Sequence, residues 1–266
     1  MTEMTITSIT KEPVVRFDGD SVSLPAEVEA RVDAYWDGLI SSGRPYTRGE
    51  VFTVTDSRTE DDTTKLTVER TDYAHYLYSR SVGLPDEFQV RIIHTAVLVE
   101  TADGMVVIGR MGTHTAKPGT YQLCGGGIDD DDLRGDVFDL GHNTRKELRE
   151  ELGIDADDSD LVRPFAPAFF KEGGKTGAIS VVYRVTIADT GEAFRKRYDT
   201  FADSLRAAGE KPEFDEIVLF DRGGSELRAF LSREEIVFDE YMVPFFGYLT
   251  EHDPAYRPDE TRPSAS

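Results

Sequence analysis

The sequence predicts an α+β protein with a mixed sheet. Strand-like and helix-like segments alternate along the chain, and some neighbouring strands are joined by short hairpin turns, an order that is not expected for a doubly wound parallel sheet. The chain has 266 residues, of which 39% are hydrophobic, so it is long enough for one large domain or two smaller ones. This composition is typical of a folded globular protein.

Acidic residues dominate the charge of the chain. Asp and Glu number 51 against 30 Lys and Arg, which gives a formal net charge of −21 at pH 7. Such a field repels phosphate backbones and anionic membrane surfaces, so we expect neither a nucleic acid nor a membrane as a partner. A small phosphorylated ligand is compatible with this charge if metal ions mask the carboxylates.

The N-terminal residues and the cysteine count predict a cytoplasmic location. The first residues lack the basic and apolar regions of a secretory signal, and no apolar run approaches the ~18 residues of a membrane span. Cys124 is the only cysteine, which excludes an internal disulfide and is most simply explained by a reducing compartment.

The first 88 residues predict a small α+β unit. Residues 24–42 place apolar side chains at helical spacing, with Ser23 as a cap, and residues 71–79 predict a second helix. Three short segments rich in β-branched or aromatic residues predict strands, at 14–17, 50–55 and 65–70.

The pattern changes near Val90, and residues 89–251 predict a second, larger domain. A turn signal at 100–104 joins its first two strands into a hairpin. The predicted strands are 92–99, 105–109, 121–124, 162–170, 178–187 and 216–220, and the predicted helices are 139–152 and 191–208. From His252 the chain is rich in proline and polar residues, so residues 252–266 predict a disordered tail.

The segment that carries chemistry is a glycine triplet followed by clustered acids. The triplet, 125–127, follows a predicted strand and precedes the acidic run 129–132. On the next helix three glutamates stand at i, i+3 and i+4 and so share one face: Glu147, Glu150 and Glu151. Carboxylates placed together repel one another, and a hard divalent cation such as Mg²⁺ turns that repulsion into coordination.

A plain structural interpretation also exists for this helix. Good helix formers often end a helix in this way, with Lys146 and Arg149 screening the acids and Gly153 as a left-handed cap. The interpretation as a site depends on the whole set occurring in order: strand, glycine triplet, acidic loop, three glutamates and a terminating Gly-Ile.

Together these features resemble the Nudix box, Gly-x5-Glu-x7-Arg-Glu-U-x-Glu-Glu-x-Gly-U, where U is aliphatic. Lys146 stands where the family has arginine, and offers a point charge instead of a planar fork. Asp132 stands where the family has its first glutamate, provided that the thirteen residues before Lys146 contain a six-residue insertion. The neighbours Asp129, Asp130 and Asp131 are alternatives to Asp132, and a solvated loop is another. The positions that match the box are Gly126, Glu147, Leu148, Glu150, Glu151, Gly153 and Ile154.

The resemblance implies a fold and an activity. The implied fold is an N-terminal small α+β unit followed by a Nudix α/β/α sandwich with a mixed sheet. The implied activity is hydrolysis of a diphosphate linkage in a small nucleoside diphosphate derivative, dependent on Mg²⁺ or on Mn²⁺ in its place. The metal ligands that it implies are Glu147, Glu150, Glu151 and Asp132, and Lys146 is a further catalytic candidate.

The layout of the chain also resembles the Nudix subgroup that cleaves UDP-glucose and UDP-galactose. The similarity covers 24–38, 71–79, 105–119 and 171–187, and includes a Pro-Gly pair at 118–119 before the glycines. It implies that a UDP-sugar is split to UMP and a sugar 1-phosphate. The candidate substrate-binding residues are Gly125, Gly126, Gly127, Arg110 and Lys117.

Three alternatives stay open at this point. ADP-ribose and dinucleoside polyphosphates are other Nudix substrates, although Phe170 stands where ADP-ribose hydrolases carry proline. Some Nudix domains bind nucleotides as sensors without cleaving them. Isopentenyl-diphosphate isomerases share the fold and carry a cysteine near Cys124, but in a Cys-Gly-His-Pro sequence that is Cys-Gly-Gly-Gly here.

Overall fold

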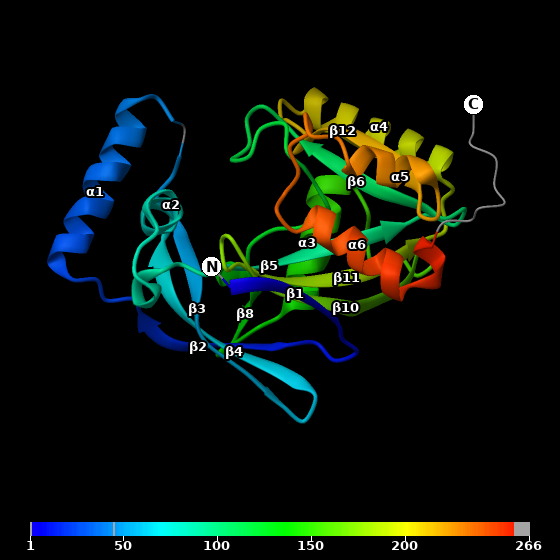
Figure 1. Cartoon of the computed structure of the whole chain (residues 1–266). Helices are drawn as coiled ribbons and strands as arrows, with labels where there is room; N and C mark the ends of the chain where they lie inside the picture. The colour runs from blue at the N-terminus through cyan, green and yellow to red at the C-terminus, as the bar shows by residue number, and fades with distance from the viewer. Residues whose placement is uncertain (1, 45, 258–266) are drawn as a thin grey trace.

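The structure is a computed structural model that describes residues 2–44 and 46–257. It contains two β-sheets with helices packed around them (Figure 1). In the described part of the chain, no helix is both long enough and apolar enough to cross a membrane.

The larger sheet has seven strands in the order β1-β10-β11-β5-β6-β12, with β7 paired to β6. β5 and β11 run parallel, and the other neighbours are antiparallel. The mixed sheet predicted from the sequence is therefore confirmed. Its strands are β1 (Thr2–Ser8), β5 (Ile93–Glu100), β6 (Met105–Met111), β7 (Tyr121–Gln122), β10 (Val162–Gly174), β11 (Ile179–Ile187) and β12 (Phe214–Asp221).

Helices cover both faces of this sheet. Side chains alternate along β5, so Val97 packs into the core shared with α3 (Leu140–Leu152) and α4 (Gly191–Ala207). Leu98 packs on the opposite side, into the core shared with α5 (Ser225–Leu231) and α6 (Met242–His252). The predicted α+β class with a sandwich architecture is confirmed, although α5 and α6 were not predicted.

The smaller sheet has five strands in the order β3-β4-β2-β9-β8. Helix α2 (Tyr73–Val82) follows directly from β4 and is capped by Asp72, whose Oδ1 accepts a hydrogen bond from the His75 amide at 2.8 Å. Helix α1 (Ala26–Ser41) packs on α2 through Val32 and Tyr78 and lies on its outer side (Figure 1). The strands are β2 (Val14–Ser21), β3 (Glu50–Glu60), β4 (Thr63–Asp72), β8 (Leu133–Arg134) and β9 (Val137–Phe138).

Strand pairing crosses the predicted domain boundary in both directions. β1, at the start of the chain, pairs with β10 of the larger sheet, with Thr7 opposite Phe170. The hairpin of β8 and β9 lies between the glycine triplet and α3, and pairs with β2 of the smaller sheet, with Phe138 opposite Val15. The division at residue 88 stays a prediction, but each predicted unit contributes strands to the sheet of the other.

The end of the described chain corrects one prediction. Residues 252–257 are ordered against the larger domain, since η3 (Pro254–Tyr256) follows α6 and Tyr256 is 1% exposed. Its hydroxyl donates to the buried Glu100 carboxylate at 2.9 Å. The prediction of disorder from His252 is therefore wrong up to residue 257, because the buried Tyr256 side chain fixes this polar segment to the larger domain. Residues 258–266 lie outside the described residues.

Candidate active site

The glycine triplet forms a loop that lies along β5. The Thr95 amide donates to the Gly126 carbonyl at 2.9 Å, and the Val97 amide donates to the Cys124 carbonyl at 2.7 Å. A side chain at Gly125 would meet the Thr95 backbone oxygen at 2.1 Å, and one at Gly126 would meet Oε1 of Glu147 at 2.4 Å. Glycine is therefore required at 125, where the loop touches the strand backbone, whereas at 126 a side chain would displace a carboxylate of α3.

Helix α3 begins and ends as its sequence predicts. Asp139 caps the first turn by accepting a hydrogen bond from the His142 amide at 2.8 Å, and Gly153 ends the helix with a φ of 66°. The helix holds Glu147 and Glu151 against the glycine loop, where Oε2 of Glu151 accepts from the Gly125 amide at 2.8 Å. Glu151 is 2% exposed, whereas Glu150 lies at the exposed edge of the same face.

The surroundings of Glu147 and Glu151 disfavour the ionised form of both carboxyl groups. Burial, together with the nearby Glu213 and Glu150 and against the opposing charge of Lys146, raises the pKa of Glu147 to about 8. Burial, together with Glu213 and Glu147, also raises the pKa of Glu151 well above its ordinary value. Ionising these groups together is costly unless a cation joins them.

Glu213, which precedes β12, is a member of this cluster that the sequence did not reveal. Burial raises the pKa of its carboxyl group, and the charge of His114 opposes that rise. A lone glutamate far from the box has no spacing or motif to mark it. Only the pairing of β12 with β6, which sets Phe214 opposite Met111, brings Glu213 to the glycine loop.

Asp132 and Lys146, the two departures from the Nudix box, contact each other. Asp132 is 0% exposed, and its carboxylate accepts from the Asp129 amide at 3.0 Å and from Nδ2 of Asn143 at 2.9 Å. Lys146 Nζ lies 3.4 Å from Asp132 Oδ1 and 2.7 Å from Asp129 Oδ2. The expectation that Asp132 is a metal ligand stays a prediction, and in this structure its Oδ2 accepts two hydrogen bonds from the protein. Through these contacts Asp132 anchors the loop to α3.

Asn143 completes this anchor and was also not predicted. Its Nδ2 donates to the Gly127 carbonyl at 3.0 Å as well as to Asp132, and its Oδ1 accepts from Thr95 Oγ1 at 2.5 Å. One buried amide therefore ties the glycine loop, the acidic turn and β5 together. The rest of the acidic run is also engaged, since Asp130 pairs with Arg70 at 2.7 Å.

The donor set suits a hard divalent cation, although its geometry is not preset. No group of three or more His, Cys, Asp or Glu side chains is arranged to hold a metal ion within residues 2–44 and 46–257. Glu213 is nevertheless close enough to raise the pKa of both Glu147 and Glu151, and Glu147 raises that of Glu151. Oxygen donors of this kind are what Mg²⁺ and Mn²⁺ prefer. Binding a metal here requires these side chains to turn toward it.

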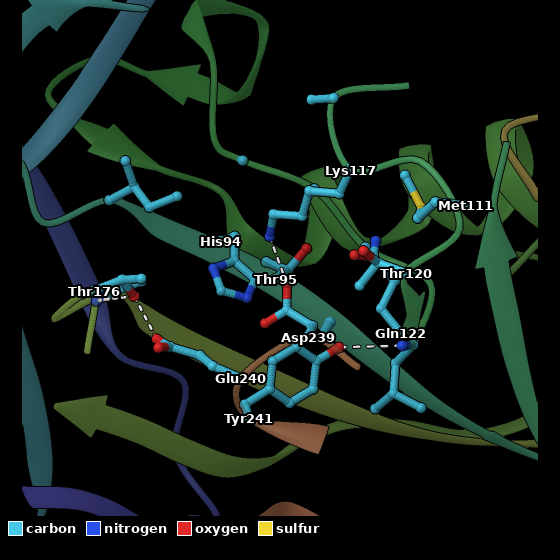
Figure 2. A pocket seen from close by; sticks show the side chains of 18 of the residues that line it. His94, Thr95, Met111, Lys117, Thr120, Gln122, Thr176, Asp239, Glu240 and Tyr241 are labelled. Carbon is cyan, nitrogen blue, oxygen red and sulfur yellow. Dashed lines mark hydrogen bonds and ion pairs between the residues drawn. The ribbon is translucent and has the colours of Figure 1, made fainter. Parts of the chain in front are cut away.

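The glycine loop lines a cavity of about 680 Å³, and Figure 2 shows side chains from its walls. Its walls come from α2, β5, the loop between β6 and β7, the β10–β11 hairpin and the segment before α6. Gly125, Gly126, Gly127 and Lys117 line the cavity as the sequence analysis expected of a substrate site. Arg110 does not line it, because its side chain pairs with Glu216 at 3.1 Å on the adjacent strand.

The cavity is far more basic than the protein as a whole. Four cationic side chains line it, against three carboxylates, in a chain whose formal net charge is −21. His94 also lines it, and burial lowers the pKa of this imidazole to about 4, so it is neutral at pH 7. This local charge favours an anionic ligand. The cationic residues are Arg80, Lys117, Lys171 and Lys175, and the acidic ones are Glu213, Asp239 and Glu240.

Cys124 does not have the features of a catalytic thiol. It is 3% exposed, and burial together with Glu151 raises the pKa of its thiol well above the ordinary value. A reactive cysteine needs the opposite environment, one that stabilises the thiolate. The structure therefore gives no support to an isomerase that uses this residue.

Comparison with known proteins identifies distant structural relatives only. No protein-family model matches the chain, and no curated protein matches it either. Among solved structures, the MutT protein from Methanosarcina mazei Go1 is 17% identical, with a TM-score of 0.40 over 62% of this chain and 97% of that one. DR0079 from Deinococcus radiodurans is 13% identical, with a TM-score of 0.44 over 75% and 98%. The Nudix domain of Shewanella oneidensis NrtR, solved with ADP ribose, is 12% identical, with a TM-score of 0.35 over 67% and 97%. At these values, functional inference depends on the residues of the site.

Proposed function

We propose that this chain is a metal-dependent hydrolase of the Nudix superfamily that cleaves a diphosphate linkage in a nucleoside diphosphate derivative. The observation that carries the proposal is the meeting of Glu147, Glu151 and Glu213 at a glycine loop that lines a basic cavity. Buried carboxylates without enough cations of their own, beside a cavity that favours anions, are suited to a metal and a phosphorylated substrate.

Glu147, Glu150, Glu151 and Glu213 would hold the metal, which would neutralise charge on the phosphate oxygens and lower the pKa of water. The glycine loop lets a phosphate approach the backbone closely, since it has no side chains in the way. Lys117 Nζ lies 2.5 Å from Asp239 Oδ2 at the wall of the cavity and supplies a further positive charge (Figure 2). Lys146 acts indirectly, by fixing α3 to the acidic turn.

For the substrate we propose a UDP-sugar, such as UDP-glucose, split to UMP and a sugar 1-phosphate. The support is the shape of the cavity, which extends from the glycine loop to α2 of the N-terminal unit. Tyr73 and Tyr76 of α2 give this wall aromatic faces, and Arg80 NH1 donates to the Tyr76 hydroxyl at 2.8 Å. A substrate with a large group on each side of the diphosphate uses walls of this kind.

The test is a substrate panel with the full chain in Mg²⁺. UDP-glucose, ADP-ribose and a dinucleoside polyphosphate are compared by kcat/KM, with nucleotide and sugar phosphate products identified and with EDTA as the control. Cleavage of UDP-glucose in preference to the others supports the whole proposal. Cleavage of another diphosphate alone removes the UDP-sugar assignment and keeps the hydrolase.

A nucleotide sensor is the second candidate, because the acidic groups within the described residues are not prearranged around a metal. A sensor binds its nucleotide without turnover. Tight binding of one panel member with no product in Mg²⁺ or Mn²⁺ would therefore replace hydrolysis by sensing.

A further inference from the structure

The β10–β11 hairpin holds a buried ion pair that the proposed hydrolysis does not use. Lys171 on β10 is 2% exposed, and its Nζ donates to the Ala178 carbonyl at 2.7 Å and to Glu240 Oε1 at 3.4 Å. The Thr176 hydroxyl donates to the same oxygen of Glu240 (Figure 2). Glu240 is thus fixed through one oxygen by two donors from the hairpin.

This ion pair and the carboxylate cluster adjoin different points of the segment that contains β5. Glu147 is reached through Gly126, which bonds to Thr95 of β5, whereas Ala178 precedes Ile179, whose amide donates to the Ile92 carbonyl. Three residues of extended chain, from Thr95 back to Ile92, span about 10 Å. A ligand that contacts both places therefore extends along this stretch of the chain.

The free oxygen of Glu240 points to the chemistry of the ligand group that lies beside it. Glu240 lines the cavity with its side chain 20% exposed, and Oε2 has no hydrogen-bond partner among the described residues. A carboxylate oxygen accepts hydrogen bonds and repels phosphate, so the ligand group beside it must be a donor without negative charge. The lining residues of the hairpin are polar or small: Lys171, Lys175, Thr176 and Ala178. Phe238 and Tyr241, which flank Glu240 in the lining, can pack on the apolar face of a ring whose hydroxyl groups Glu240 accepts from.

We propose that Glu240, oriented by Lys171 and Thr176, binds hydroxyl groups of a sugar ring at the end of the ligand remote from the carboxylate cluster. This inference rests on the proposed function for the identity of the phosphorylated part. Lys171 is a positioning residue, because it is buried and contacts Glu240. Glu240 is the residue that distinguishes a glycosylated diphosphate from a plain one.

The experiment compares the binding of matched ligands with and without the terminal sugar. Kd is measured by calorimetry for UDP-glucose against UDP and for ADP-ribose against ADP, with Ca²⁺ in place of Mg²⁺ and with product formation checked. Glu240→Gln is expected to weaken binding of the sugar-bearing ligand about tenfold, the scale of a hydrogen bond to a charged group, and that of its sugar-free partner less than twofold. Thr176→Val, which removes one of the two orienting donors, should give a smaller loss with the same selectivity.

Glu172→Gln is the matched control, because Glu172 lies next to Lys171 but is exposed and outside the cavity lining. It should leave every Kd unchanged. A selective loss in the UDP pair identifies a hexose and one in the ADP pair a ribose, and either supports the inference. An equal loss for both members of each pair, or a wild type that binds the sugar-bearing ligands no more tightly, overturns it. Because Kd is measured without turnover, the role of Glu240 in binding can be judged even if the protein hydrolyses none of these ligands.

Discussion

The carboxylates beside the β10–β11 hairpin and those at the glycine loop differ in how their charge is neutralised. At the hairpin end each acid has its own cation, and Lys117, working against burial, holds the pKa of Asp239 below its ordinary value. At the glycine loop, burial and neighbouring acids raise the pKa of Glu147 to about 8. Lys146, the nearest cation, is committed to Asp129 and Asp132. The carboxylates at the hairpin are neutralised by cations of the protein, whereas those at the glycine loop need a cation from solution.

Removing a carboxylate from the cluster at the glycine loop should have the largest effect on activity. Glu151→Gln and Glu150→Gln are each expected to lower kcat/KM with Mg²⁺ by at least about two orders of magnitude while the protein stays folded, because the loss falls on metal binding. Glu192→Gln on α4, where an exposed glutamate pairs with Lys196, is the control and should not change turnover. Near-wild-type turnover in either variant would exclude the proposed metal site.

Substitutions at two neighbouring glycines should separate a loss of activity from a loss of stability. Gly126→Ala places a methyl group 2.4 Å from Glu147 Oε1, the end of a side chain that can move, so we expect a loss in kcat/KM of about 10- to 100-fold with a small change in Tm. Gly125→Ala places it 2.1 Å from the Thr95 backbone oxygen, at a φ of 148°, so we expect a large loss of stability. Equal effects on Tm from the two substitutions would contradict this assignment.

Lys146 should have a smaller effect, since it acts by positioning. Lys146→Ala is expected to lower kcat/KM on the order of tenfold, as loss of a group that orients metal ligands commonly does. Lys146→Arg should preserve or raise activity, because its planar fork can also pair with Asp129 and Asp132. An alanine variant with unchanged kinetics would show that the contact is idle.

The last effect concerns stability and pH in the absence of metal, and leaves turnover aside. The folded chain keeps a proton on Glu147 that the unfolded chain releases, so the free energy of unfolding should fall as pH rises between about 4.5 and 8. One such group contributes a slope of at most about 1.4 kcal/mol per pH unit. Urea unfolding in EDTA at pH 6 and pH 8 measures it, and Glu147→Gln should reduce the slope. Identical slopes in the two proteins would show that Glu147 is not held protonated.

The parts of the site that local sequence determines were predictable. Asp139 and Gly153 cap α3, and 3.6-residue periodicity then places Glu147 and Glu151 on one face, so the acidic helix follows from a dozen residues. Strands were predicted where apolar or β-branched residues run continuously, as in β5 and β11, whereas β1, β8 and β9 were not predicted.

The parts that depend on distant pairing were not predictable. Glu213 reaches the site only because β12 pairs with β6, and no spacing within the sequence encodes that pairing. No strand was predicted between Asp132 and α3, but this segment forms the β8–β9 hairpin, whose partner β2 lies more than a hundred residues earlier. The sequence shows that Asp132 is acidic and so suggests a metal ligand, but it does not show that Asp132 is buried against Asn143.

The pairing of β1 with β10 has a consequence for how the protein is made. Thr7 lies opposite Phe170, so β1 has no partner strand until most of the chain exists. Because ribosomes add roughly 5–20 residues per second, β1 is synthesised on the order of ten seconds before β10. The larger sheet therefore closes late in translation, and until then β10 and β1 each have an open edge that can pair with another chain.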